Sequence, residues 1–375
     1  FKTPYAHILV DEVQDLTPLQ LAVIQALAAA SGAAVFAIGD PRQSIYAFRG
    51  AAKNARAELE RFWPDLRVVG LTENYRSAQS VLDLSAGLFR GGGRLTAMSR
   101  RADEDFGEIQ LFKAPTAGSE ISWIGERIRR LLGGASLTLA RDLGARTLSP
   151  GDVAVLVRFH ALAAPIHRGL TRLGIPCSMP EAEAFWMEPR VRVILDAASR
   201  LLGMAGLQDG TPLSCPDRVL AKGPLALSAY LDEIEPFDRL FWQSPQFRAM
   251  CRGYDQHGGW AGLISHVNAQ TELELVSRKA EKVRIMSLHA SKGLEFEAVF
   301  LPALEDGLVP FAGTDFLTGK AAGAEERPDE DEERRLFYVG LTRAKSRLFI
   351  SHAAKRELFG RLMMLKPSRF LEGLS

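Results

Sequence analysis

The sequence is poor in cysteine, in long apolar runs and in net charge, and each shortage excludes a class of protein. Its three cysteines, Cys177, Cys215 and Cys251, are too few and too far apart for a disulfide framework or a cysteine metal site. No apolar run approaches the roughly 20 residues that span a bilayer, and no secretory signal is recognisable. We therefore expect a cytoplasmic protein that has no contact with a membrane.

The balance of charge does not identify a partner. Lys and Arg total 46 against 45 Asp and Glu, for a net charge of +1. A surface for nucleic acid would therefore have to come from local clustering of basic side chains. At 375 residues the chain is too long for one ordinary core, and two or three domains are expected.

The stretch from Ile8 to Asp15 organises the chain. An apolar run, Ile8-Leu-Val10, predicts a buried strand of a parallel sheet, and it ends in Asp11 and Glu12. Ligands of open α/β sheets bind at the carboxyl ends of strands. There one carboxylate can hold the Mg²⁺ of a nucleotide, while its neighbour takes a proton from a water molecule. Taken alone, the motif fits equally well a strand that runs into a polar turn.

A second apolar run, 33–38, predicts a neighbouring buried strand, and Gly39 to Gly50 follows it. This segment brings Tyr46 and Phe48 close to Arg49. In an extended chain the two rings share a face, where they can stack on the bases of a single strand for roughly 1–3 kcal/mol per base. Packing into a core is the commoner fate of aromatic side chains.

Five segments together resemble the helicases of superfamily 1 in the UvrD/Rep/PcrA family. Asp11 to Asp15 is similar to motif II and Gly39 to Gly50 to motif III, followed by Leu71 to Ser77 (motif IV), Leu288 to Phe296 (motif V) and Glu332 to Lys345 (motif VI). The segments stand in the order of the family, and motifs II, III, V and VI are each specific. Chance agreement of all five is a poor explanation.

The resemblance implies that ATP and Mg²⁺ bind between two RecA-like domains. It assigns to the nucleotide a Mg²⁺ ligand (Asp11), a general base (Glu12), a γ-phosphate sensor (Gln43), an adenine-stacking ring (Tyr75), a cation at the γ-phosphate (Arg76), a sugar contact (Glu295) and an arginine finger (Arg343). It assigns to single-stranded DNA the residues Tyr46, Phe48, Arg49, His289 and Lys292. Outside the motifs, a lone lysine such as Lys292 would be read as an exposed surface residue.

The resemblance also implies an α/β fold of RecA-like P-loop NTPase type, with parallel sheets flanked by helices. Residues 1–70 are expected to be the C-terminal part of a first RecA-like domain, and 71–180 with 281–375 a second one. Residues 181–280 break the alternation of strands and helices and predict a mainly helical insertion, similar to the family's 2B subdomain but reduced in length.

Two departures from the family pattern matter. No Gly-x-x-x-x-Gly-Lys-Ser/Thr loop, whose amides and lysine cradle phosphates, occurs in the sequence. We therefore expect a truncated first domain, no activity of this chain alone, and a missing ATPase part supplied upstream or by a partner. Pro41 and Phe48 also make motif III more similar to that of the AddA/RecB branch.

The function that the resemblance implies is an ATP-dependent DNA helicase of repair or recombination. It would move 3′ to 5′ on single-stranded DNA or at duplex–single-strand junctions. The alternative is a non-catalytic DNA-binding or assembly subunit of a split or degenerate helicase. A helicase–nuclease subunit, as in AddA, would need a nuclease domain after motif VI, for which the sequence has no room.

Overall fold

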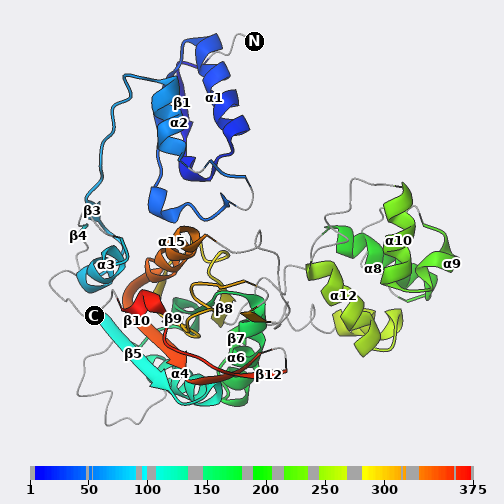
Figure 1. Ribbon diagram of the computed structural model, residues 1–375. Helices are drawn as coiled ribbons and strands as arrows, with labels where there is room; N and C mark the ends of the chain where they lie inside the picture. The colour runs from blue at the N-terminus through cyan, green and yellow to red at the C-terminus, as the bar shows by residue number, and fades with distance from the viewer. Residues whose placement is uncertain are drawn as a thin grey trace. The chain divides into compact units, whose positions relative to one another are not determined.

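The structure is a computed structural model, and its residues group into two compact units, Phe1–Ser178 with Lys282–Ser375, and Met179–Glu281. Figure 1 shows the elements of both. None of the helices in the described ranges is long and apolar enough to cross a membrane. The described residues are 5–47, 50–52, 54–89, 95–98, 107–133, 147–179, 189–204, 215–234, 245–267, 281–313, 316–317, 329–358 and 360–372.

A six-stranded sheet in the order β5-β10-β9-β6-β8-β7 forms the centre of the first unit, and all its pairings are parallel. Its strands alternate with helices along the chain, which confirms the predicted α/β class. The bounds are β5 (Glu108–Ala114), β6 (Val153–Val157), β7 (Cys177–Ser178), β8 (Val283–Ser287), β9 (Phe296–Leu301) and β10 (Ala344–Ala353).

Helices cover both faces of this sheet, so its central strands are apolar on both sides. On one face Trp123 of α4 (Ala117–Leu131) packs against the stacked rings of Phe300 and Phe349, beside α6 (His160–Arg172). Side chains of the opposite parity, such as Leu348, lie in the core with α3 (Gln79–Ala86) and α15 (Glu330–Leu341). The short 3-10 helix η5 (Pro150–Asp152) leads into β6.

The amino-terminal strands β1 (His7–Val10) and β2 (Ala34–Ala37) pair in parallel. Helix α1 (Pro18–Ser31) joins them and packs on α2 (Ala55–Phe62) through Leu21 and Leu59. The prediction that both strands are buried was wrong, since Leu9 is 74% and Phe36 61% exposed. The reason is that this sheet has two strands in the described part of the chain, too few to be covered on both faces.

Two smaller sheets complete the first unit. Strands β3 (Glu73–Asn74) and β4 (Thr96–Ala97) pair in parallel, and β11 (Lys355–Leu358) forms an antiparallel hairpin with β12 (Arg361–Met364). Another 3-10 helix, η8 (Arg369–Leu371), lies near the carboxyl end and places Phe370 in the main core.

A buried ion-pair cluster ties α4 to the carboxyl ends of the central strands. Arg356 donates hydrogen bonds to Glu120 (2.6 Å) and to both carboxylate oxygens of Glu305 (2.7 and 2.9 Å). The hydroxyl of Ser351 donates to Glu120 at 2.8 Å. Burial raises the pKa of Glu305, and the hydrogen bond from Arg356 opposes that rise.

The second unit is built from helices in all its described ranges. They are α8 (Pro189–Leu201), α9 (Asp217–Leu220), α10 (Pro224–Ile234) and α12 (Pro245–Gln256). Its core gathers Leu195, Leu227, Phe247 and Trp260, and the indole of Trp260 donates to the carbonyl of Leu220 at 2.7 Å. The assignment of this unit as a 2B-like insertion stays a prediction.

Candidate nucleotide site

The site begins at the turn after β1. Glu12 has φ 50° and ψ 42°, the left-handed region, which a non-glycine residue seldom occupies. Its amide donates to the Asp11 carboxylate at 2.9 Å, and the Gln14 amide group donates to its Oε2. Strained backbone of this kind concentrates at functional sites. The turn therefore presents two adjacent carboxylates at the carboxyl end of a strand.

The tip of β2 is locked against this turn. Gln14, which is buried, accepts a hydrogen bond from the amide of Asp40 at 3.1 Å. Asp40 in turn caps the 3-10 helix η2 (Pro41–Gln43) and accepts from the side chain of Gln43 at 3.0 Å. A Cβ on Gly39 would lie 2.3 Å from Gln14 Oε1, so only glycine permits this approach. The motifs contain Gln14 and Asp40, but the sequence pattern alone does not indicate that these two side chains join the strand tips.

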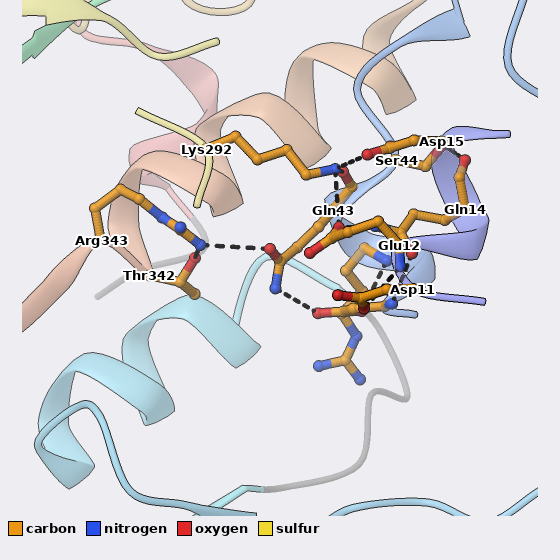
Figure 2. A network of polar contacts seen from close by, with 11 residues as sticks. Asp11, Glu12, Gln14, Asp15, Gln43, Ser44, Lys292, Thr342 and Arg343 are labelled. Atoms are coloured by element: carbon orange, nitrogen blue, oxygen red, sulfur yellow. Dashed lines mark hydrogen bonds and ion pairs between the residues drawn. The ribbon is translucent and has the colours of Figure 1, made fainter. Parts of the chain in front are cut away.

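Arg343 reaches Gln43 from the other side of the site (Figure 2). It is 1% exposed and follows the end of α15, whereas the sequence predicts a helix that continues to Lys345. Its guanidinium donates to the carbonyls of Val339 and Leu294, both at 3.0 Å, and to Gln43 Oε1 at 3.4 Å. Burial, with repulsion from Arg76, lowers its pKa to about 10, so it stays charged at neutral pH.

Lys292 also points to the strand tips, where Figure 2 shows it beside Asp15. Its side chain is 9% exposed. The ammonium donates to the carboxylate of Asp15, which lies in the 3-10 helix η1 (Val13–Asp15), and to the main-chain carbonyl of Gln43 at 2.9 Å. It lies 3.4 Å from Glu12 Oε2. Its predicted contact with DNA is not tested by this geometry.

A second cluster joins motifs IV and V. Arg76 donates to Glu295 at 2.8 Å, and Lys345 lies 2.6 Å from the other oxygen of that carboxylate. The hydrogen bond from Lys345 lowers the pKa of Glu295, and the charge of Arg76 acts in the same direction. Asn74 fixes the turn because its side chain accepts from the amides of Arg76 (2.9 Å) and Ser77 (2.8 Å).

Tyr75 presents an exposed ring next to this cluster in the sequence. The ring is 69% exposed, and its hydroxyl donates to Glu73 at 2.8 Å. That hydrogen bond raises the pKa of the Tyr75 phenol.

The residues predicted to bind DNA are placed less completely. Tyr46 is half-buried against the main core, where Ile45 is fully buried, and its ring centroid lies 5.1 Å from the Lys292 ammonium. His289 is half-buried in the turn after β8. Phe48 and Arg49 lie outside the described residues.

The arrangement has part of the chemistry that a Mg²⁺–triphosphate needs, without the phosphate-binding loop. Arg343 and Arg76 supply cations, and Asp11 and Glu12 supply carboxylates. In the described part of the chain no three or more His, Cys, Asp or Glu side chains form a metal site by themselves. Mg²⁺ usually uses one or two carboxylates and completes its shell with substrate phosphates and water, so this donor set fits it.

Two family models match the chain. The model of the UvrD-like helicase C-terminal domain matches residues 69–200 and 238–355, and that of the UvrD/REP helicase N-terminal domain matches residues 1–62. A solved structure of the C-terminal domain of a possible DNA helicase from Lactobacillus plantarum WCFS1 matches 80% of this chain and 94% of its own, with 10% identity and a TM-score of 0.33.

Curated relatives match along the whole chain. The ATP-dependent DNA helicase UvrD2 of Mycobacterium tuberculosis is 31% identical over 100% of this chain and 51% of its own length. UvrD1 of the same species is 26% identical, and the match covers 99% of this chain and 58% of UvrD1. A probable DNA helicase II homolog of Rickettsia conorii is 24% identical, and the match covers 99% of this chain and 64% of that protein. The chain thus spans about half the length of the first of these relatives.

Proposed function

Because the chain belongs to the UvrD/Rep family of superfamily 1 helicases, we propose that it carries part of an ATP-driven DNA motor. The observation that carries the proposal is the convergence of residues from different motifs: Gln43 contacts Arg343, and Lys292 lies 3.4 Å from Glu12. Gln43 and Arg343 are 300 positions apart in the chain, and their side chains meet. A strained acidic turn opposite a buried arginine is expected in a nucleotide site and not in a purely structural protein.

In this proposal Asp11 holds Mg²⁺, which neutralises charge on the phosphates, and Glu12 takes a proton from the attacking water. Arg343 stabilises the charge that develops on the transferred phosphoryl group, a role worth roughly 10³–10⁵ in rate. Gln43 contacts the γ-phosphate and moves when the phosphate is lost, and this movement shifts the loop that contains Tyr46. The exposed ring of Tyr75 supports a role in adenine stacking.

Two further roles follow the family pattern. Arg76 assists Arg343 at the γ-phosphate, and Glu295, which holds Arg76 at 2.8 Å, contacts the sugar. Single-stranded DNA passes Tyr46, Phe48, Arg49 and His289 in the 3′ to 5′ direction. The preferred partner is single-stranded DNA or its junction with duplex, in repair or recombination in the cytoplasm.

The phosphate-binding loop must come from elsewhere, since the sequence contains none. We propose that it lies on a segment outside residues 1–375, in the same polypeptide or in a partner chain. The greater length of the relatives supports this. Under this proposal residues 1–375 alone hydrolyse ATP negligibly.

ATP hydrolysis tests the proposal, measured with and without oligo-dT on residues 1–375 and on a polypeptide extended by the loop-bearing segment. We expect turnover only in the extended protein, stimulation by DNA, and its loss in Glu12→Gln. Turnover by residues 1–375 would show that the phosphate site is wrongly assigned. An inactive extended protein that binds DNA would favour the second candidate, a non-catalytic DNA-binding or assembly subunit.

A further inference from the structure

Resting on the proposed function, we propose that Lys292 is a positioning residue for the general base Glu12 and not a ligand of the DNA backbone. It links the turn after β1 to the loop after β2, and thereby fixes the position of the Glu12 carboxylate.

Two hydrogen bonds and an ion pair already engage the Lys292 ammonium. An ammonium has three N–H groups. Three acceptors surround this one: the Asp15 carboxylate, the Gln43 carbonyl at 2.9 Å and Glu12 Oε2 at 3.4 Å. With the side chain 9% exposed, a DNA phosphate would have to displace one of these acceptors.

The contacts to Glu12 fall on one oxygen. Gln14 donates to Oε2, and Lys292 lies 3.4 Å from the same atom. Under the proposed function, this leaves Oε1 to accept the proton of the attacking water, and the side chain as a whole is 55% exposed. Because the backbone of Glu12 is in the left-handed region, side-chain contacts are needed to hold the carboxylate in one orientation.

Asp15 makes the arrangement depend on the lysine. Its Oδ1 is buried without a hydrogen-bond partner, and its Oδ2 accepts from Lys292. Burial raises the pKa of Asp15, and the hydrogen bond and charge of Lys292 counteract the rise. Without the lysine, the turn that carries Glu12 loses the cation that compensates the partly buried carboxylate of Asp15.

The first test replaces Lys292 by methionine, which has similar length and no charge, in the extended ATPase. We expect kcat to fall by about 10²-fold, the usual consequence of displacing a catalytic group by 1 Å. Affinity for oligo-dT without nucleotide and its salt dependence should stay as in wild type. Lys355→Met, at an exposed lysine of β11, is the matched control and should change neither quantity.

A DNA ligand would give the opposite pattern. Its removal weakens DNA binding and reduces the salt slope by about one, with kcat at saturating DNA retained. That result would overturn the proposal. An inactive wild-type extended protein would instead overturn the proposed function, so the two failures are distinguishable.

Asp15→Asn decides the matter if Lys292→Met does not fold. It keeps the lysine but removes its anchor, so we expect a lower kcat with unchanged DNA affinity. Where both variants fold, the double variant should be no slower than the slower single variant, because both changes break the same contact. Additive losses, or a change in DNA affinity alone, would contradict the positioning role.

Discussion

Replacement by alanine should affect stability very differently at two buried arginines of this protein. Arg343 is buried, and within the described part of the chain no carboxylate accepts a hydrogen bond from it, while Arg356 is buried between Glu120 and Glu305. A buried charge without a partner of opposite sign destabilises the fold. When a buried charge has such a partner, removing one member of the pair destabilises the fold, because the other charge is left uncompensated.

The structure sets the magnitude for Arg343. Burial lowers its pKa from the ordinary value to about 10, which corresponds to about 3 kcal/mol of unfavourable free energy for the charged form at neutral pH. Removing the side chain relieves this penalty. It also removes packing and the hydrogen bond to Leu294, a loss of about 2–5 kcal/mol. The carbonyl of Val339 keeps a donor in Thr342 Oγ1 at 3.0 Å. The terms nearly cancel.

We therefore expect Arg343→Ala to change the free energy of unfolding by less than about 2 kcal/mol, while ATP hydrolysis of the extended protein falls by roughly 10³–10⁵. Arg356→Ala leaves two buried carboxylates without their cation and should cost about 3–5 kcal/mol. Urea unfolding followed by circular dichroism and a phosphate-release assay measure the two effects. A loss above about 4 kcal/mol for Arg343→Ala, or a rate within tenfold of wild type, would refute this reasoning.

Three further predictions concern other parts of the chain. Gly39→Ala should destabilise the protein by about 1–3 kcal/mol in thermal unfolding, because the new methyl group meets Gln14 at 2.3 Å, whereas Gly70→Ala, with nothing within 4 Å, should be near neutral. Glu295→Gln should make the free energy of unfolding less dependent on pH in the acid range. The folded protein lowers the pKa of Glu295, so this carboxylate adds stability at pH values above its ordinary pKa of 4.5, and that stability is lost as the pH falls through the lower pKa of the folded state. Trp260→Phe should cost about 1 kcal/mol in unit 179–281, measured by urea unfolding, through loss of the hydrogen bond to Leu220.

The sequence predicts the six-stranded sheet well because its strands are covered on both sides. Val153 to Val157 is an unbroken apolar run, and all five of its residues are buried. In the same kind of run at Ile8 to Val10, only Val10 is buried in the structure. An apolar run shows that the side chains of a strand can be buried. Whether they are buried depends on the strands and helices that pack against them.

The motifs predict which residues belong to the site better than they predict the directions of their side chains. The pattern around Lys292 marks it as functional, but its spacing cannot reveal that the ammonium points to Asp15, 277 positions away. The pattern around Arg343 resembles a helix up to Lys345 because Leu341, Arg343, Ala344 and Lys345 are good helix formers. In the structure Ala344 already belongs to β10, and this early end of the helix turns Arg343 inward.

Lys292 and Arg343 both contact Gln43, Lys292 at its main chain and Arg343 at its side chain. This difference suggests how the site opens. Lys292 bonds its main-chain carbonyl at 2.9 Å, whereas Arg343 approaches its side chain at 3.4 Å. Arg343 is anchored more firmly by Val339 and Leu294, each at 3.0 Å. The contact between the side chains is thus the weakest of the set, since hydrogen bonds weaken as they lengthen. Under the proposed function, Arg343 can exchange Gln43 for a phosphate oxygen without leaving its own anchors, while Lys292 keeps the loop in place.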